Sequence, residues 1–113
     1  MMVRRMEVNR RRVRVLVHVC ETEHERARGL LFRRRIAADE AWLIPDCHAV
    51  HTVGLWYALD LAFCTRDGTI LQIVPRLRPW RFARLPVANE VWELPPGMAE
   101  AFDLQPGDRL TAR

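Results

Sequence analysis

Residues 59–74, LDLAFCTRDGTILQIV, contain the strongest indication of the fold. Two apolar runs, 59–65 and 70–74, flank the pair Asp67-Gly68. An Asp-Gly pair between apolar runs is typical of a tight β-hairpin turn, because glycine takes up positive φ without steric cost. We therefore predict an antiparallel hairpin at the centre of the chain, with the turn at residues 66–69.

The stretch before this hairpin predicts a strand followed by a helix. Residues 13–19 alternate with a period of two and place four valines on one face, as in a half-buried strand. Thr22 and Glu25 then have the spacing of a capping box, in which each side chain bonds the backbone of the other residue. A helix over residues 23–31 follows from this start signal.

The rest of the chain predicts short elements separated by turns. They are a strand over 41–44 stopped by Pro45, an extended stretch over 51–57 with Gly54 as a bulge, a loop over 76–86, a strand over 88–94, a short helix over 98–102, a turn over 105–108 and an edge strand over 109–111. This pattern favours an α+β fold, a compact β-rich single domain with a mainly antiparallel, barrel- or sandwich-like sheet and two short helices.

Length and charge restrict the organisation and the location of the protein. The 113 residues fit one domain. Residues 1–35 hold 11 arginines and 4 glutamates, so we separate a basic N-terminal segment, 1–12, from a β-rich domain, 13–113. No apolar run approaches the roughly 20 residues of a membrane-spanning helix, and no signal-peptide pattern follows the start. These features predict a cytoplasmic protein that does not enter membranes.

Several short motifs occur in a particular order along the chain. They are RARGLL at 26–31, CHAVHTVG at 47–54, LDLAF at 59–63, PWR at 79–81, ELPPG at 93–97 and QPGD at 105–108. This ordered set resembles the domain of unknown function family 192. The resemblance covers about Val13 to Leu110, and it implies a compact β-rich fold with short helices and an uncharacterised activity. The sequence departs from the family pattern at Leu55, where methionine is expected, and at Ala58, where proline is expected.

Cys47, His48 and His51 form the cluster that most suggests chemistry. Zinc takes sulfur, nitrogen and oxygen ligands, so these side chains are candidate ligands together with Asp60 or Glu93. In an extended chain, however, Cys47 and His51 lie about 13 Å apart, at ~3.3 Å per residue, and the two histidines point in opposite directions. We therefore predict no metal and no other cofactor.

The same cluster has two other interpretations. Cys47 could act as a thiolate nucleophile with a histidine base, but the sequence around it carries no recognisable signature of such an enzyme. Alternatively, His51 and Thr52 bond the backbone of a turn, while Asp60 and Glu93 satisfy buried donors or line a ligand pocket. We expect at least one of these two acids to contact Arg28, Arg81 or His51. The candidates for this polar pocket are His51, Thr52, Asp60, Glu93, Arg28 and Arg81.

Two arginine-rich stretches are candidates for nucleic-acid binding. Residues 76–84 interleave arginines with Trp80 and Phe82, a pattern that can stack and neutralise a nucleic-acid strand. The alternative, which we favour, is a loop that covers the core with these aromatic side chains while its arginines stay in water. The arginines of residues 4–14 bind nucleic acid weakly and without selectivity at most.

The sequence thus predicts a small binding or accessory domain with a polar pocket near the His51-Thr52 motif. Its partner would be a small ligand or a protein, and the chain would be a monomer or a weak dimer. The alternatives are a small metal-assisted or thiol-dependent enzyme and a weak, non-specific nucleic-acid binder.

Overall fold

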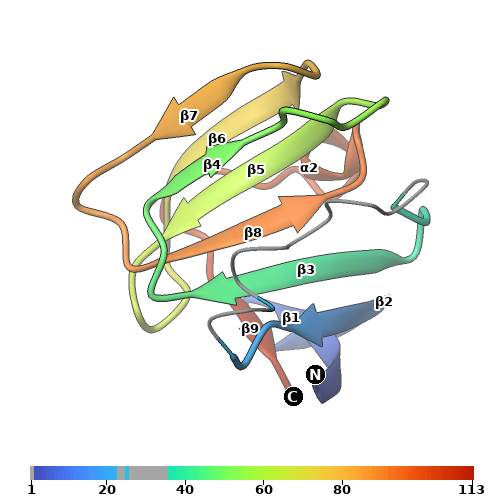
Figure 1. Ribbon diagram of the computed structural model, residues 1–113. Coiled ribbons are helices and arrows are strands. Elements are labelled where there is room, and N and C mark those ends of the chain that lie inside the picture. The colour runs from blue at the N-terminus through green and yellow to red at the C-terminus, as the bar shows by residue number, and fades with distance from the viewer. Residues whose placement is uncertain (1, 23–24, 26–35) are drawn as a thin grey trace.

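The computed structural model describes residues 2–22, 25 and 36–113, and in this part of the chain strands predominate (Figure 1). The strands and the helix are β1 (Met2–Val8), β2 (Arg11–Val19), β3 (Glu40–Pro45), β4 (Ala49–His51), β5 (Leu59–Cys64), β6 (Ile70–Leu77), β7 (Phe82–Arg84), β8 (Glu90–Leu94), α2 (Met98–Ala101) and β9 (Leu110–Ala112).

Seven strands form one sheet in the order β6-β5-β8-β3-β2-β1-β9, and β4 pairs with β7 in a second sheet. β2 and β3 run parallel, and the other neighbouring strands are antiparallel. The two edge strands lie close at one point, where Thr69 and Arg109 form an isolated bridge. The large sheet is therefore curled but is not a closed barrel, which corrects the barrel that the sequence left open.

Two apolar clusters cover the two faces of the large sheet. The first includes Val15 and Val17 of β2, with Val13 and Val19 packed against it, which confirms the alternating face predicted for this strand. The second cluster lies on the opposite face, and Val50 of β4 and Ala83 of β7 pack against it. The small sheet thus forms a second layer over the large one (Figure 1).

The start of the chain is part of the sheet. Residues 2–8 form β1, which pairs with β2 on one side and with β9 on the other. Met6 is fully buried in the first cluster. The basic segment that the charge distribution sets apart therefore supplies an interior strand next to the edge strand β9, because alternate side chains of a strand can be buried while the others stay in water.

The predicted hairpin is confirmed. β5 and β6 pair antiparallel across the turn, and Gly68 has a φ of 89°. The strand predicted over 88–94 appears as β8, and the short helix predicted after Pro96 appears as α2. Thr22 and Glu25 exchange the two hydrogen bonds of a capping box, at 3.0 and 3.1 Å. Of the helix predicted over 23–31, only Glu25 is among the described residues, so α2 is the one helix whose full extent they contain.

Two predictions for the middle of the chain are wrong. Residues 51–57 are not extended, because β4 ends at His51 and Gly54, with a φ of 89°, lies in a turn. Residues 76–86 are not simply a loop, because they contain the end of β6 and the whole of β7. Both errors have one cause: β4 and β7 are three residues long and pair across about 30 residues of sequence, which local patterns do not reveal.

Candidate functional site

Thr52 holds together the two turns next to the small sheet. It is fully buried, and its hydroxyl donates to the carbonyl of Arg78 at 2.6 Å and accepts from the N–H of Arg81 at 2.9 Å. Its own N–H donates to the carbonyl of Arg81, and its carbonyl accepts from the N–H of Trp80 at 3.0 Å. This confirms the interpretation of Thr52 as a residue that bonds the backbone of a turn.

The Thr52 contacts fix Trp80 in an unusual backbone conformation. Trp80 has a φ of 62°, which bulky residues rarely adopt and which costs about 1–3 kcal/mol. Its side chain is nevertheless 64% exposed, and that of Phe82, two residues later, is 77% exposed. The sequence-based interpretation that these aromatic side chains cover the core is therefore wrong.

The small sheet has one face on the core and one face in water. His51 pairs with Phe82 and Ala49 with Arg84, and all four are exposed. The ring centroids of His51 and Phe82 lie 6.1 Å apart. Trp56, just beyond the Thr52 turn, is 91% exposed. We call this region the β4–β7 surface; it consists of His51, Trp80, Arg81, Phe82 and Arg84.

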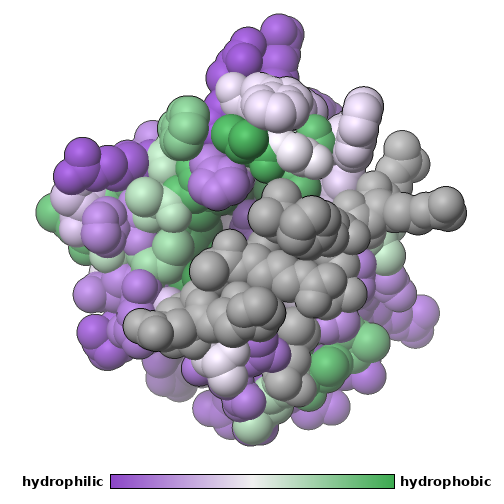
Figure 2. Space-filling model, in the orientation of Figure 1, coloured by the Kyte–Doolittle hydropathy of each residue, from purple (hydrophilic) through white to green (hydrophobic). Residues whose placement is uncertain are grey.

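The charge of the β4–β7 surface is of one sign. Residues 47–59 and 76–89 include four arginines and two histidines and no carboxylate. Figure 2 shows apolar and weakly polar side chains beside strongly hydrophilic ones where Figure 1 places β4 and β7. The alternation of aromatic and basic residues over 76–84 is visible in the sequence. The sequence-based interpretation, however, placed Trp80 and Phe82 against the core, whereas both side chains are exposed.

Asp60 and Glu93 do not share a pocket. In the β5–β8 ladder Asp60 pairs with Leu94 and Glu93 with Leu61. Paired residues point to the same face and successive residues to opposite faces, so the two carboxylates lie on opposite sides of the large sheet. The structure therefore does not gather the six predicted pocket residues into one site.

Asp60 is a structural acid. It is 1% exposed, and its two oxygens accept hydrogen bonds from the N–H groups of Arg76 at 2.9 Å, Gly97 at 3.1 Å and Ala99 at 2.9 Å. Two of these donors belong to the start of α2, so Asp60 caps that helix from β5. The prediction that Asp60 satisfies buried donors is confirmed, although the donors are backbone groups and not the cations that we expected.

Glu93 is buried without such partners. It is 3% exposed, and its Oε1 has no hydrogen-bond partner in the described part of the chain. Burial raises the pKa of Glu93 to about 7. Of the expected partners, Arg81 is exposed and donates to the carbonyl of Trp80, the Nδ1 of His51 accepts from the N–H of Val53, and Arg28 lies outside the described residues.

Within the part of the chain that the structure describes, the candidate metal ligands form no group that could hold a metal ion. Among residues 2–22, 25 and 36–113, no group of three or more histidine, cysteine, aspartate or glutamate side chains could hold a metal ion. The Sγ of Cys47 donates to the carbonyl of Ala49, and His48 is exposed. Cys20 and Cys64 are buried, and burial raises the pKa of the Cys64 thiol.

The comparisons with known proteins identify the family. A family model described as an uncharacterized ACR, domain of unknown function 192 (DUF192), matches residues 5–112. This chain belongs to the DUF192 family. The match confirms the resemblance seen in the sequence, and the family description assigns no activity to this DUF192 domain. No curated protein matches the chain.

Two solved structures are similar to this DUF192 domain. One is described as a candidate transcription regulator from Sinorhizobium meliloti 1021; it has a TM-score of 0.86 and 24% identity, with 98% of this chain and 94% of that chain covered. The other is a protein of unknown function from Novosphingobium aromaticivorans DSM 12444, with a TM-score of 0.78, 21% identity and coverage of 96% and 84%. At these identities the likeness shows the fold. No helix among the described residues is long and apolar enough to cross a membrane.

The burial of Glu93 predicts a pH-dependent gain in stability on its replacement. Its pKa is raised from 4.5 to about 7, so ionisation opposes folding increasingly as the pH rises between these values, and the penalty is constant above them. Glu93→Gln removes the charge and should raise the free energy of unfolding at pH 8 by about 1–3 kcal/mol, with little change at pH 4. Urea unfolding at both pH values measures this.

The exposed Glu100→Gln is the control for Glu93→Gln and should change stability little at either pH. If Glu93→Gln instead destabilises the protein more at pH 8 than at pH 4, a partner stabilises the carboxylate in the folded protein and the account of Glu93 is wrong.

Proposed function

We propose that this DUF192 domain is a small binding module that takes single-stranded nucleic acid on the β4–β7 surface, beside the His51-Thr52 motif. The observation that carries the proposal is Trp80, which is held at a φ of 62° while its indole is 64% exposed. An exposed aromatic side chain contributes little to stability, so a strained turn that presents one favours a role in binding.

Stacking and charge together favour a nucleic-acid strand over other ligands. Exposed tryptophan and phenylalanine side chains stack on the faces of unpaired bases whatever the sequence. Arg81 and Arg84 lie in the same stretch as Trp80 and Phe82, and no carboxylate occurs between residues 76 and 89 to oppose a phosphate. The proposal rests on this surface and not on the description of the Sinorhizobium meliloti protein, since 24% identity supports a shared fold alone.

The experiment measures the affinity of the protein for a fluorescent twelve-nucleotide thymidine strand by anisotropy at low salt. The double variant Trp80→Ala/Phe82→Ala should weaken binding at least about 30-fold, because two stacked bases are lost and each contributes about 1–3 kcal/mol. Two or three phosphate contacts should give a slope of log K against log salt of about −2. Binding should stay weak and non-selective at physiological salt.

Two controls localise the binding. Phe102→Ala removes an aromatic side chain that is 37% exposed beside α2, and it should leave the affinity unchanged. Arg10→Ala/Arg11→Ala changes Arg10 in the turn between β1 and β2 and Arg11 at the start of β2. If this second variant loses the binding while Trp80→Ala/Phe82→Ala retains it, nucleic acid binds the N-terminal hairpin and the proposed surface is wrong.

A further inference from the structure

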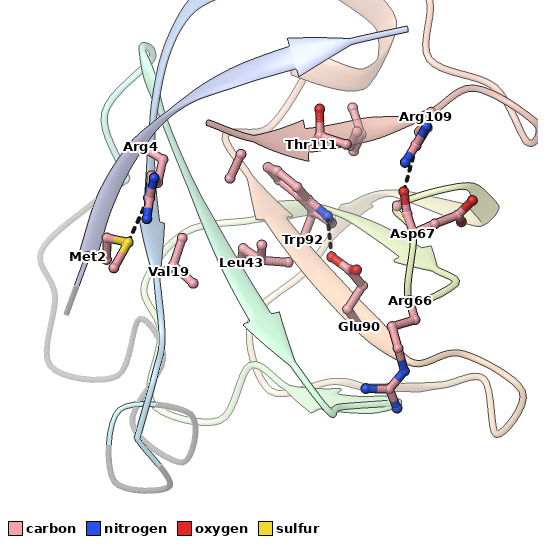
Figure 3. Close-up of a pocket in the computed structure, with 13 residues that line it drawn as sticks. Met2, Arg4, Val19, Leu43, Arg66, Asp67, Glu90, Trp92, Arg109 and Thr111 are labelled. Carbon is pink, nitrogen blue, oxygen red and sulfur yellow. Dashed lines mark hydrogen bonds between the residues drawn. The ribbon is translucent and has the colours of Figure 1, made fainter. Parts of the chain in front are cut away.

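A cavity lies at the open end of the curled sheet, where the edge strand β9 approaches the β5–β6 turn. Its volume is about 470 Å³, within the range of small-molecule sites. Its lining comes from β1, β2, β3, β8, β9 and the turn at residues 66–68, so strands from both ends of the chain surround it (Figure 3). None of the residues of the β4–β7 surface lines this cavity.

The floor of the cavity is apolar. Val19, Leu43 and Leu110 line it and belong to the first core cluster or pack against it. Trp92 is fully buried below them, and its indole N–H donates to the Oε2 of Glu90 at 3.0 Å (Figure 3). A ligand that enters the cavity would therefore place an apolar part against the core of the protein.

The rim of the cavity has an excess of positive charge. Arg4, Arg66 and Arg109 line it, against the acids Asp67 and Glu90. Arg109 donates to the backbone carbonyl of Asp67 at 2.7 Å, and the Nε of Arg4 donates to the sulfur of Met2. Within the described residues Arg4 forms no ion pair with a carboxylate, so its guanidinium group can bind an anion.

Glu90 does not oppose such an anion at neutral pH as strongly as an ordinary carboxylate would. It is partly buried, and desolvation raises its pKa to about 7 despite the hydrogen bond from Trp92. Near neutral pH a large share of this group is therefore uncharged and can donate a hydrogen bond.

We infer that this cavity is a second binding site, for a small organic anion that has an apolar body and a carboxylate. The apolar part lies on the Val19, Leu43 and Leu110 floor, and the carboxylate meets Arg4 on the rim, since the Nε of Arg109 already donates to the Asp67 carbonyl. Guanidinium groups match carboxylates in shape and bind them with two parallel hydrogen bonds. The inference is independent of the nucleic-acid proposal, because the two sites share no residue.

The test titrates the intact protein with 2-naphthoate and follows the indole N–H signals of its four tryptophans by NMR. The Trp92 signal should shift and saturate with one ligand per chain. Arg4→Ala should weaken binding by at least about fivefold, since it removes one charge-assisted contact. Arg5→Ala is the matched control: the neighbouring residue on β1 is exposed and does not line the cavity, and its loss should change the affinity by less than about twofold.

The neutral compound 2-naphthalenemethanol tests the need for charge and should bind at least about tenfold more weakly than 2-naphthoate. The inference is wrong if Trp92 does not respond to millimolar 2-naphthoate. It is also wrong if Arg4→Ala and Arg5→Ala weaken binding equally, or if the neutral compound binds as tightly as the anion.

Discussion

Replacing Gly68 by alanine should destabilise the protein by about 3–5 kcal/mol, because the new side chain would collide with backbone. Gly68 has a φ of 89°, and a Cβ placed there would lie 1.9 Å from the carbonyl oxygen of Leu110. The carbonyl of Gly68 also accepts a hydrogen bond from the N–H of Leu110 at 2.9 Å. The β5–β6 turn and β9 would have to separate to make room, which would open the curled sheet. Urea unfolding measures the loss.

Gly107→Ala is the matched control for Gly68→Ala. Gly107 has a φ of 100°, but nothing lies within 4 Å of an added Cβ. This variant should therefore lose about 1 kcal/mol, the cost of the positive φ alone. If both variants lose the same amount, the contact between the turn and β9 contributes nothing beyond backbone strain.

Asp60→Asn should cost about 2–4 kcal/mol, the second large effect that we expect. The carboxylate accepts three backbone hydrogen bonds in a buried setting, and an amide can present one oxygen and not two. The amide NH₂ would then face a backbone N–H, so at least one buried donor would lose its partner. The unfolding transition in urea measures this loss, and amide hydrogen exchange should increase at Ala99.

Asp103→Asn provides the comparison for Asp60→Asn, since Asp103 is exposed and should lose less than about 0.5 kcal/mol. Parental stability of Asp60→Asn would show that the carboxylate does not hold α2 on the sheet. Asp60 would then be free for a role in binding.

Short-range patterns in the sequence correctly predicted the central hairpin and the buried face of β2. The Asp67-Gly68 pair predicts the hairpin, because a tight turn needs positive φ within two residues. The alternation of residues 13–19 predicts which face of β2 is buried, because side chains of a strand alternate. Both signals are complete within a few residues.

Features that depend on distant pairing were not predictable. The need for glycine at Gly68 comes from Leu110, which is more than 40 residues away in sequence. Asp60 and Glu93 each lie between apolar neighbours and look alike in sequence, but the register of β5 against β8 puts them on opposite faces. Backbone donors meet Asp60 on one face, whereas apolar side chains surround Glu93 on the other.

Of the features that depend on distant pairing, the outward orientation of Trp80 matters most for the proposed binding surface. Arginines on both sides of Trp80 and Phe82 fit a loop that covers the core as well as a binding surface. Contacts of Thr52 with residues 78–81 turn the Trp80 indole outward, and they join segments more than 25 residues apart. The proposed site therefore depends on the buried Thr52. For this residue the sequence predicted only a hydrogen bond to the backbone of a turn, without saying which turn.

The most direct test of the nucleic-acid proposal compares two strands of equal charge. A twelve-nucleotide thymidine strand and an abasic strand with the same number of phosphates are titrated against the parent protein at the same salt concentration. If bases stack on Trp80 and Phe82, the abasic strand should bind at least about tenfold more weakly, because it retains the phosphates and lacks the stacking. Equal affinity for the two strands would mean that charge alone holds the strand, and it would contradict the proposed role of the β4–β7 surface.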